Sequence, residues 1–378
     1  MPWIHFHVGS RGQVNACCVA NIPYGNINTH SLNQIWHGDA INEVRSQFLS
    51  GEPDQRCHNC IQKETAGAKS IRQETLEKFP AFQALKETPS QPIYFDIRFS
   101  NVCNFRCRTC WHGASSKWFA DAKLLGNNSG EKAIIKNIDD FEDFLSKSSN
   151  ALLSAEEFYF AGGEPLFTEE HYLLLEWLIA NRATKARLRY NTNFSKLKFK
   201  HYDILELWKH FPQVEILASI DASEDLGEYI RKEMKWQEIL TNREAIRALP
   251  HLTFKLSPTI SVFNVEHLPT LYKQAVHLNL ISPEDLYINI LEYPAYYNIQ
   301  ILPAHKKQKV REVYQQFFTW LSENNLPENI SKTFQDILQY MDQPTPLSTT
   351  KQEKLWKQFQ MQTAKLDYIR GESVLDFI

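Results

Sequence analysis

The chain has 378 residues, of which 43% are hydrophobic and 22% are charged. This composition excludes a globally disordered chain, and the length predicts two or three domains. Lys and Arg number 41 against 44 Asp and Glu, a balance that excludes a basic protein coating nucleic acid. The longest apolar run, 172–180, contains Glu176 and is too short to cross a bilayer, so we expect no membrane span.

The cysteines are the most informative residues, because all seven lie in the first third of the chain. They are Cys17, Cys18, Cys57, Cys60, Cys103, Cys107 and Cys110. An odd number, with no secretory signal visible at the N-terminus, argues against a disulfide framework. In a reducing compartment, clustered cysteines favour metal or redox chemistry.

The first group of cysteines lies within residues 1 to about 75. Cys17 and Cys18 are adjacent, and a C-x2-C pair, Cys57 and Cys60, follows a helix-like stretch at 31–52. Four cysteines at this spacing are compatible with a small zinc ribbon, although adjacent cysteines suit a zinc site poorly. The spacing alone therefore does not exclude a zinc site in this segment.

The second group follows a strand-like run at 93–100. Cys103, Cys107 and Cys110 form the pattern C-x3-C-x2-C. Three thiolates on one short loop can bind three irons of a [4Fe–4S] cube, whose usual ligands are four cysteines. The fourth iron is then open to an outside ligand. Zinc is the alternative, but it prefers four closed ligands.

The next strand-like run, 157–161, is followed by Gly162-Gly163-Glu164-Pro165. Two glycines allow a backbone to approach a ligand closely, and a neighbouring carboxylate can accept from an ammonium group. Alone, the motif would be a turn. Its place after a strand, about 50 residues beyond the cysteine loop, favours a binding role.

Polar residues also follow the later strand-like runs. Asn193 follows the run that starts at 186, and Ser219 and Asp221 follow the run that starts at 214. Arg231 comes twelve residues after Ser219. Each residue could separately belong to a turn or cap a helix. Their order at successive strand ends indicates one shared site.

Strands and helices are predicted to alternate through the middle of the chain. The predicted strands are 93–99, 157–161, 186–191, 214–220, 253–261 and 285–291. The predicted helices are 137–147, 168–182, 200–210, 225–248 and 266–279. This alternation predicts a parallel sheet with right-handed crossovers, with the chemistry at the C-terminal ends of the strands. Amphipathic helical patterns predict a helical extension beyond residue 303.

The cysteine loop and the strand before it resemble the signature of the radical S-adenosylmethionine (SAM) superfamily. The resemblance implies a partial (β/α)6 TIM-like barrel with a [4Fe–4S] cluster at Cys103, Cys107 and Cys110. It also implies that SAM chelates the open iron and is reductively cleaved to a 5′-deoxyadenosyl radical. The downstream motifs resemble the SAM-binding positions of that family. These are Gly162, Gly163, Glu164, Asn193, Ser219, Asp221 and Arg231. No further catalytic residue is predicted.

The N-terminal segment resembles the auxiliary-cluster segment called SPASM, or its shorter form, twitch. The stretches PWIHFHVGSRGQVNACC and CHNC-x3-E carry the resemblance. It implies one auxiliary [4Fe–4S] cluster bound by Cys17, Cys57 and Cys60. Cys18 is either a fourth ligand or a bystander that leaves an open iron. The predicted domains are 1–90 for the auxiliary cluster, 91–300 for the barrel and 301–378 for the helical extension.

The function implied by both resemblances is a radical SAM enzyme that abstracts hydrogen from a peptide or small metabolite. An electron donor such as flavodoxin or ferredoxin is the implied partner. The charge disfavours nucleic acid, and we expect neither a membrane nor a secretory route but a cytoplasmic protein. The alternative is a non-enzymatic zinc- or cluster-binding protein on a degenerate radical SAM barrel.

Overall fold

The computed structural model describes residues 1–65, 69–82, 89–127, 130–343 and 349–374. They form two compact parts. The first part comprises Met1–Val102, Ile134–Tyr190 and Lys198–Val214, and the second comprises Cys103–Ala133, Asn191–Leu197 and Glu215–Ile378. The predicted domains 1–90, 91–300 and 301–378 divide the chain along its sequence and stay a prediction.

The first part is built on a mixed sheet. Its strands are β1 (His5–Val8), β2 (Gln13–Cys17), β3 (Ala20–Asn26), β4 (Tyr94–Ile97), β5 (Glu157–Phe160) and β6 (Arg187–Thr192), of which β6 ends in the second part. The order is β6-β5-β4-β1-β2-β3. β1, β4, β5 and β6 are parallel, whereas β2 is antiparallel to both β1 and β3. A short hairpin, β7 (Lys198–Phe199) and β8 (Tyr202–Asp203), lies outside this sheet.

Helices cover one face of the parallel strands. These helices are α6 (Phe141–Leu153), α7 (Glu169–Ala180) and α8 (Ile204–Trp208). Phe160 and Tyr190 on the strands contact the ring of His171 on α7, with ring centroids 4.8 and 5.3 Å apart. Alternate strand residues therefore form an apolar core beneath the helices, and the residues between them lie on the other face.

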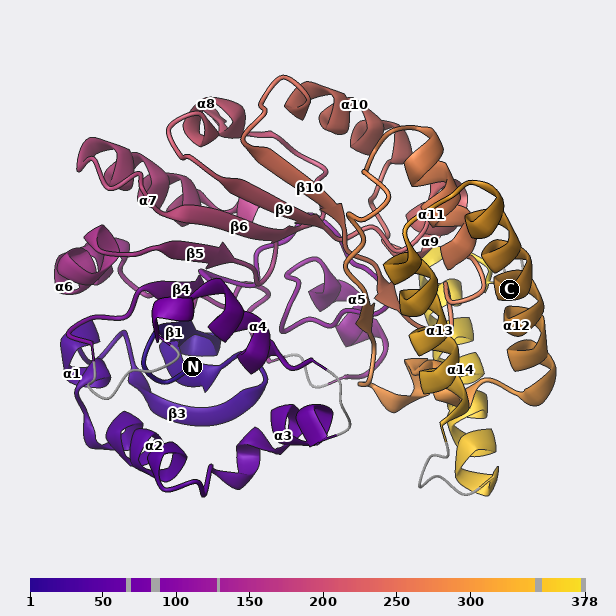
Figure 1. The fold of residues 1–378 in the computed structure, drawn as a ribbon, viewed down its shortest axis with the longest axis horizontal. Helices are drawn as coiled ribbons and strands as arrows, with labels where there is room; N and C mark the ends of the chain where they lie inside the picture. The colour runs from indigo at the N-terminus through magenta and orange to yellow at the C-terminus, as the bar shows by residue number, and fades with distance from the viewer. Residues whose placement is uncertain (66–68, 83–88, 128–129, 344–348, 375–378) are drawn as a thin grey trace. The chain divides into compact units, whose positions relative to one another are not determined.

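Four shorter helices belong to the N-terminal segment. They are α1 (Leu32–Trp36), α2 (Asp39–Leu49), α3 (His58–Thr65) and α4 (Ile71–Lys78). Figure 1 shows α1, α2 and α3 arranged along β3. The helix-like stretch predicted at 31–52 is two helices. Ser31 caps α1 through a capping box with Gln34, and Gly38 precedes α2.

The second part contains the remaining strands and most of the long helices. Its strands are β9 (Val214–Ala218), which begins in the first part, β10 (Leu252–Leu256), β11 (Thr259–Ile260) and β12 (Asn289–Ile290). Its helices are α5 (Trp118–Leu124), α9 (Glu224–Ile230), α10 (Trp236–Ile246), α11 (Leu268–His277), α12 (Ala304–Glu323), α13 (Glu328–Asp342) and α14 (Thr349–Arg370). β9 neighbours β10, and β11 pairs with β12 in parallel.

The predicted α/β class, the parallel strands and the helical C-terminal extension are confirmed. Within the described residues the strand order does not close into a barrel. One predicted helix, 225–248, is wrong in its continuity, because Arg231 leaves helical geometry and Glu233 has a φ of 82°. The chain therefore turns between α9 and α10, and Arg231 lies in this turn, where it pairs with Asp221.

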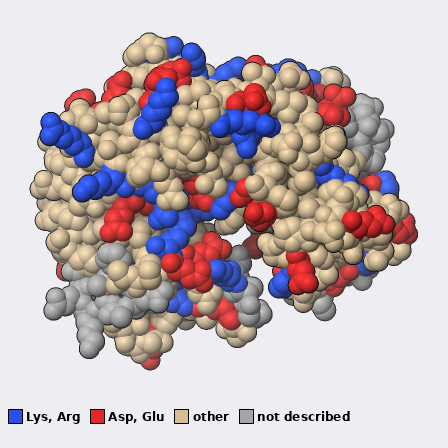
Figure 2. All heavy atoms as spheres, turned by 45° about the horizontal axis from the view of Figure 1, so that its top comes forward, with Lys and Arg blue, Asp and Glu red and all other residues tan. Residues whose placement is uncertain are grey.

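No helix in the described ranges has both the length and the apolar character needed to cross a membrane. On the face drawn in Figure 2, basic and acidic side chains are interspersed. This mixed surface agrees with the net charge of −3.

Candidate functional site

The loop that carries Cys103, Cys107 and Cys110 is held by its own backbone and by two donors to sulfur. The Cys110 N–H donates to the Cys107 carbonyl at 3.0 Å. The Phe105 N–H lies 3.4 Å from Cys103 Sγ, and Arg231 Nη1 lies 3.7 Å from Cys107 Sγ. Such donors stabilise sulfur that carries negative charge, as cluster ligands do.

The segment at the start of α5 holds the other side of the loop. Ser115 Oγ donates to the Phe105 carbonyl at 2.5 Å, and Trp118 Nε1 donates to the Cys107 carbonyl at 2.6 Å. Both donors are buried, so these carbonyls exchange water for protein partners. The stretch after the cysteines therefore fixes the loop conformation.

Asp221 and Arg231 form a buried bidentate ion pair. Arg231 Nε lies 2.9 Å from Asp221 Oδ2, and Nη2 lies 3.0 Å from Oδ1. The Thr259 N–H also donates to Asp221 Oδ1 at 2.8 Å. Burial alone would lower the pKa of Arg231, but the Asp221 carboxylate holds it above its ordinary value. A permanent cation therefore stands between Asp221 and Cys107.

Asn193 is tied to the cysteine loop through side chains. Its Nδ2 donates to Asn104 Oδ1 at 2.8 Å, and Asn104 Nδ2 donates to Ser195 Oγ at 2.8 Å. Ser195 Oγ donates back to Asn193 Oδ1 at 2.7 Å. Ser219 lies at the next strand end, where its N–H donates to the Thr192 carbonyl at 2.8 Å. The loop and two strand ends thus meet within the second part.

The Gly162–Glu164 motif lies in the first part, against the residues that lead into the cysteine loop. A side chain at Gly163 would place its Cβ 2.1 Å from the Val102 carbonyl oxygen, which no residue but glycine avoids. The Glu164 N–H donates to that same carbonyl at 2.7 Å. The Glu164 carboxylate is buried and accepts from the Leu166 N–H at 3.0 Å. These contacts show a structural role for the motif at Val102 and Leu166.

The predicted site residues are therefore grouped in two ways. Within the second part the structure brings together the three cysteines, Asn193, Ser219, Asp221 and Arg231. Gly162, Gly163 and Glu164 pack on Ser100–Val102 in the first part. The role of each residue toward SAM stays a prediction.

The donor set of the cysteine loop fits an iron–sulfur cluster. Burial raises the pKa of Cys110 to about 12, so this site favours thiols unless a metal supplies compensating positive charge. Across the described ranges, no three His, Cys, Asp or Glu side chains are already gathered as a metal site. The fit consequently rests on three soft thiol donors in one short, well-held loop.

A second group of thiols lines a small cavity of about 30 Å³ in the first part. Cys17 comes from the end of β2, and Cys57 and Cys60 come from the start of α3 and the turn before it. Tyr24 and Arg56 also line the cavity. Three thiols on one mainly apolar cavity fit a metal cluster shielded from water.

Cys18 lies away from that cavity. It is absent from the described cavity lining, and its electrostatic neighbours include Asp96 and Arg98. Consecutive residues of an extended chain point to opposite faces, which explains why Cys17 and Cys18 separate. Burial raises the pKa of the Cys18 thiol to about 12. Its side chain belongs to a polar face of the sheet.

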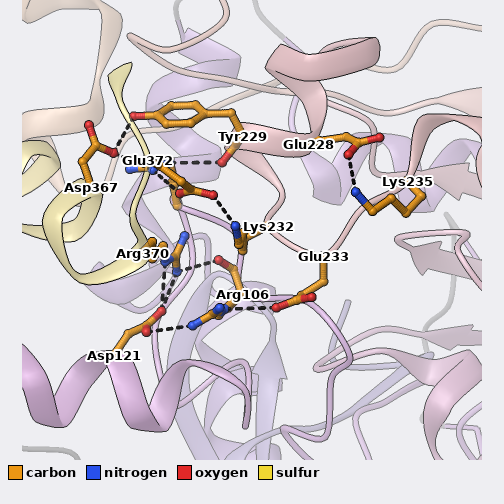
Figure 3. A network of polar contacts seen from close by, with 11 residues as sticks. Arg106, Asp121, Glu228, Tyr229, Lys232, Glu233, Lys235, Asp367, Arg370 and Glu372 are labelled. Carbon is orange, nitrogen blue, oxygen red and sulfur yellow. Dashed lines mark hydrogen bonds and ion pairs between the residues drawn. The ribbon is translucent and has the colours of Figure 1, made fainter. Parts of the chain in front are cut away.

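Sequence reasoning missed a contribution from the C-terminal extension to the cysteine loop. Figure 3 shows Arg106, Asp121 and Arg370 in one network of polar contacts. Arg370 donates to Asp121 Oδ2 from Nε at 3.0 Å and from Nη2 at 2.8 Å. Its Nη2 also donates to the Arg106 carbonyl at 2.8 Å. The last turn of α14 therefore holds the loop between Cys103 and Cys107.

A second arginine of the loop is held by the same extension. Arg108 Nη2 lies 2.6 Å from Asp367 Oδ1 and 2.5 Å from Glu372 Oε2. Its guanidinium stacks 3.6 Å from the centre of the Tyr229 ring. No motif could have revealed these partners, because a polar helical tail is usually solvated. Figure 3 places Asp367, Glu372 and Tyr229 together.

The described fold is thus an α/β protein whose cysteines form two groups. Residues 1–61 match the SPASM family model, an iron–sulfur cluster-binding domain. This match confirms the predicted resemblance of the N-terminal segment. No curated protein sequence matches the chain.

Two solved structures are distantly similar to the chain. One is SuiB from Streptococcus suis bound to S-adenosylmethionine, with 11% identity and a TM-score of 0.39. That similarity covers 74% of this chain and 61% of SuiB, so the chain spans less than two thirds of that protein. The other is TYW1 with a lysine–pyruvate adduct bound, with 10% identity, a TM-score of 0.33, and coverage of 58% of this chain and 70% of TYW1.

Proposed function

We propose that this protein is a radical SAM enzyme that carries one auxiliary iron–sulfur cluster. The observation that supports it most is the contact of the Cys103–Cys110 loop with Arg231, which is paired to Asp221. Bound together, a [4Fe–4S] cluster and SAM would supply reductive cleavage to a 5′-deoxyadenosyl radical.

In this proposal Cys103, Cys107 and Cys110 hold the cluster, and Arg231 supplies positive charge beside it. Asp221 orients Arg231 through one hydrogen bond, from Nη2 to Oδ1, and an ion-pair contact between Nε and Oδ2. Asn193, Ser219 and the Gly162–Glu164 motif position SAM. The α5 segment and the last turn of α14 keep the loop rigid and exclude water from it.

The auxiliary site is proposed to be Cys17, Cys57 and Cys60 around their shared cavity. The SPASM match over residues 1–61 supports iron rather than zinc there. The position of Cys18, away from the cavity lining, favours three protein ligands over four. The substrate is proposed to be a peptide or small metabolite, and the electron donor a flavodoxin or ferredoxin.

The test is SAM cleavage by anaerobically reconstituted protein with dithionite as the electron source. We expect 5′-deoxyadenosine and methionine from the wild type, and neither from the variant with Cys103, Cys107 and Cys110 all changed to Ala. A wild type that holds its full iron but forms no 5′-deoxyadenosine would support the non-enzymatic alternative and refute the enzyme.

A further inference from the structure

A row of polar residues crosses the sheet of the first part on the face opposite α6 and α7. The pairing register places one residue from each of five neighbouring strands side by side. In spatial order they are Asn15, His7, Asp96, Tyr159 and Arg189. Polar residues lined up across one face of these strands need a reason, because parallel strands usually present apolar side chains on both faces.

The neighbouring row on the same face contains Tyr94, Glu157 and Arg187, and its charges are paired. Glu157 is fully buried and lies 3.1 Å from Lys78 Nζ and 2.7 Å from Arg187 Nε. Beneath it, Phe79 packs on Tyr94 with ring centroids 5.8 Å apart. The charge of Glu157 is therefore offset by Lys78 and Arg187.

The row that contains Asp96 differs, because the neighbouring cation Arg98 keeps one edge of its guanidinium unused. Arg98 lies two residues beyond Asp96, on the same face. Its Nε is 3.4 Å from Asp96 Oδ1, and within the described chain its two terminal nitrogens have no protein partner. Its side chain is 32% exposed, whereas that of Asp96 is 1% exposed. Asp96 thus anchors one edge of the guanidinium and leaves the Nη edge for a planar anion.

His7 adds a second polar atom at the same level of the sheet. Its Nδ1 lies 2.9 Å from Asp96 Oδ2. The neighbouring charge of Arg98 outweighs burial and keeps the pKa of Asp96 well below its ordinary value, so Asp96 is an acceptor. His7 Nε2 lies close to Gly9, where an added Cβ would be 3.2 Å away, so a side chain at Gly9 would crowd this nitrogen.

This face adjoins the Gly162 motif. A Cβ at Gly162 would lie 3.1 Å from Arg98 Cβ, and Gly162 has a φ of 111° that suits glycine alone. Arg98 therefore lies next to the motif that, in the proposed function, positions SAM.

We propose that Arg98, anchored by Asp96 and accompanied by His7 Nε2, binds a carboxylate of the substrate. The substrate is then a carboxylate-bearing metabolite or peptide. A carboxylate is favoured over a phosphate because Asp96 already offsets part of the guanidinium charge, which suits a monoanion better than a dianion. The assignment rests on the proposed radical SAM function.

The experiment is calorimetric titration of succinate into the iron-loaded protein under anaerobic conditions, with SAM present at saturation. Succinamide is the neutral isostere, and inorganic phosphate is the competing anion class. We expect saturable succinate binding, no succinamide binding, and at least about tenfold weaker succinate binding by Arg98→Gln. Arg247→Gln changes an exposed arginine of the second part that is paired with Glu244; it is the matched control and should bind as the wild type does.

Arg98→Gln leaves the buried Asp96 carboxylate without the cation beside it. The double variant Asp96→Asn/Arg98→Gln therefore removes both charges together. It should retain iron and still fail to bind succinate. Equal binding by wild type and Arg98→Gln, or no saturable binding by the wild type, would overturn the proposal. Competition between SAM and succinate would assign Arg98 to SAM itself and also overturn it. Binding of phosphate instead of succinate would refute the carboxylate assignment. Formation of 5′-deoxyadenosine by the wild type is measured separately, so that a failure of the proposed function is distinguishable.

Discussion

Replacing Arg370 tests whether the C-terminal extension holds the cysteine loop. The Arg370 side chain is fully buried, and its partner Asp121 is 2% exposed. Arg370→Gln would remove two charge-assisted hydrogen bonds to Asp121 and one to the Arg106 carbonyl. Asp121 would keep one ion pair, with Arg106 Nη1 at 3.0 Å.

The expected cost is a loss of about 3–5 kcal/mol in the free energy of unfolding, because removing one partner leaves a buried carboxylate under-compensated. Guanidinium denaturation followed by tryptophan fluorescence measures it. The control is Arg247→Gln, whose exposed side chain pairs with Glu244 and donates to the Asn279 carbonyl at 3.1 Å, and its loss should cost about 1 kcal/mol or less. A loss of under about 1 kcal/mol for Arg370→Gln would refute the structural role assigned to Arg370. The same variant should also lose iron faster to a chelator than the control does.

Three further predictions concern other sites. Burial lowers the pKa of His171 to about 3 from 6.5, so the stability that it contributes is complete above pH 6.5 and is lost as the pH falls toward 3. His171→Phe should therefore flatten the pH dependence of the unfolding free energy in that window by about 1.4 kcal/mol per pH unit, and an unchanged slope would contradict this. Gly163→Ala should abolish soluble folded protein or cost several kcal/mol, since its Cβ would meet the Val102 oxygen at 2.1 Å; wild-type thermal stability would show that the close approach is absent. Cys18→Ala should keep the wild-type iron content while Cys57→Ala loses about four irons, and equal losses would make Cys18 a ligand.

Much of the parallel core could be predicted, because apolar strands were followed by glycine or polar residues at their ends. β4, β5, β6 and β9 begin within one residue of the predicted starts. The continuous helix expected over 225–248 failed for a tertiary reason. Periodicity continues through Arg231, but the chain turns there and Arg231 pairs with Asp221 instead.

The N-terminal strands β1, β2 and β3 were not predicted, because that segment was interpreted through its cysteines. Their pairing is what separates Cys17 from Cys18. The row of His7, Asp96 and Arg189 depends on register between strands, which a single sequence does not contain. The contact of Arg370 with Asp121 joins residues far apart in the chain and has no local signal.

Iron content tests the central claim of two separate clusters most directly. The comparison uses anaerobically purified wild type, the variant with Cys103, Cys107 and Cys110 changed to Ala, and the variant with Cys17, Cys57 and Cys60 changed to Ala. The account predicts about eight irons in the wild type and about four in each variant. Iron that is absent from the wild type, or that stays unchanged in either variant, would contradict it.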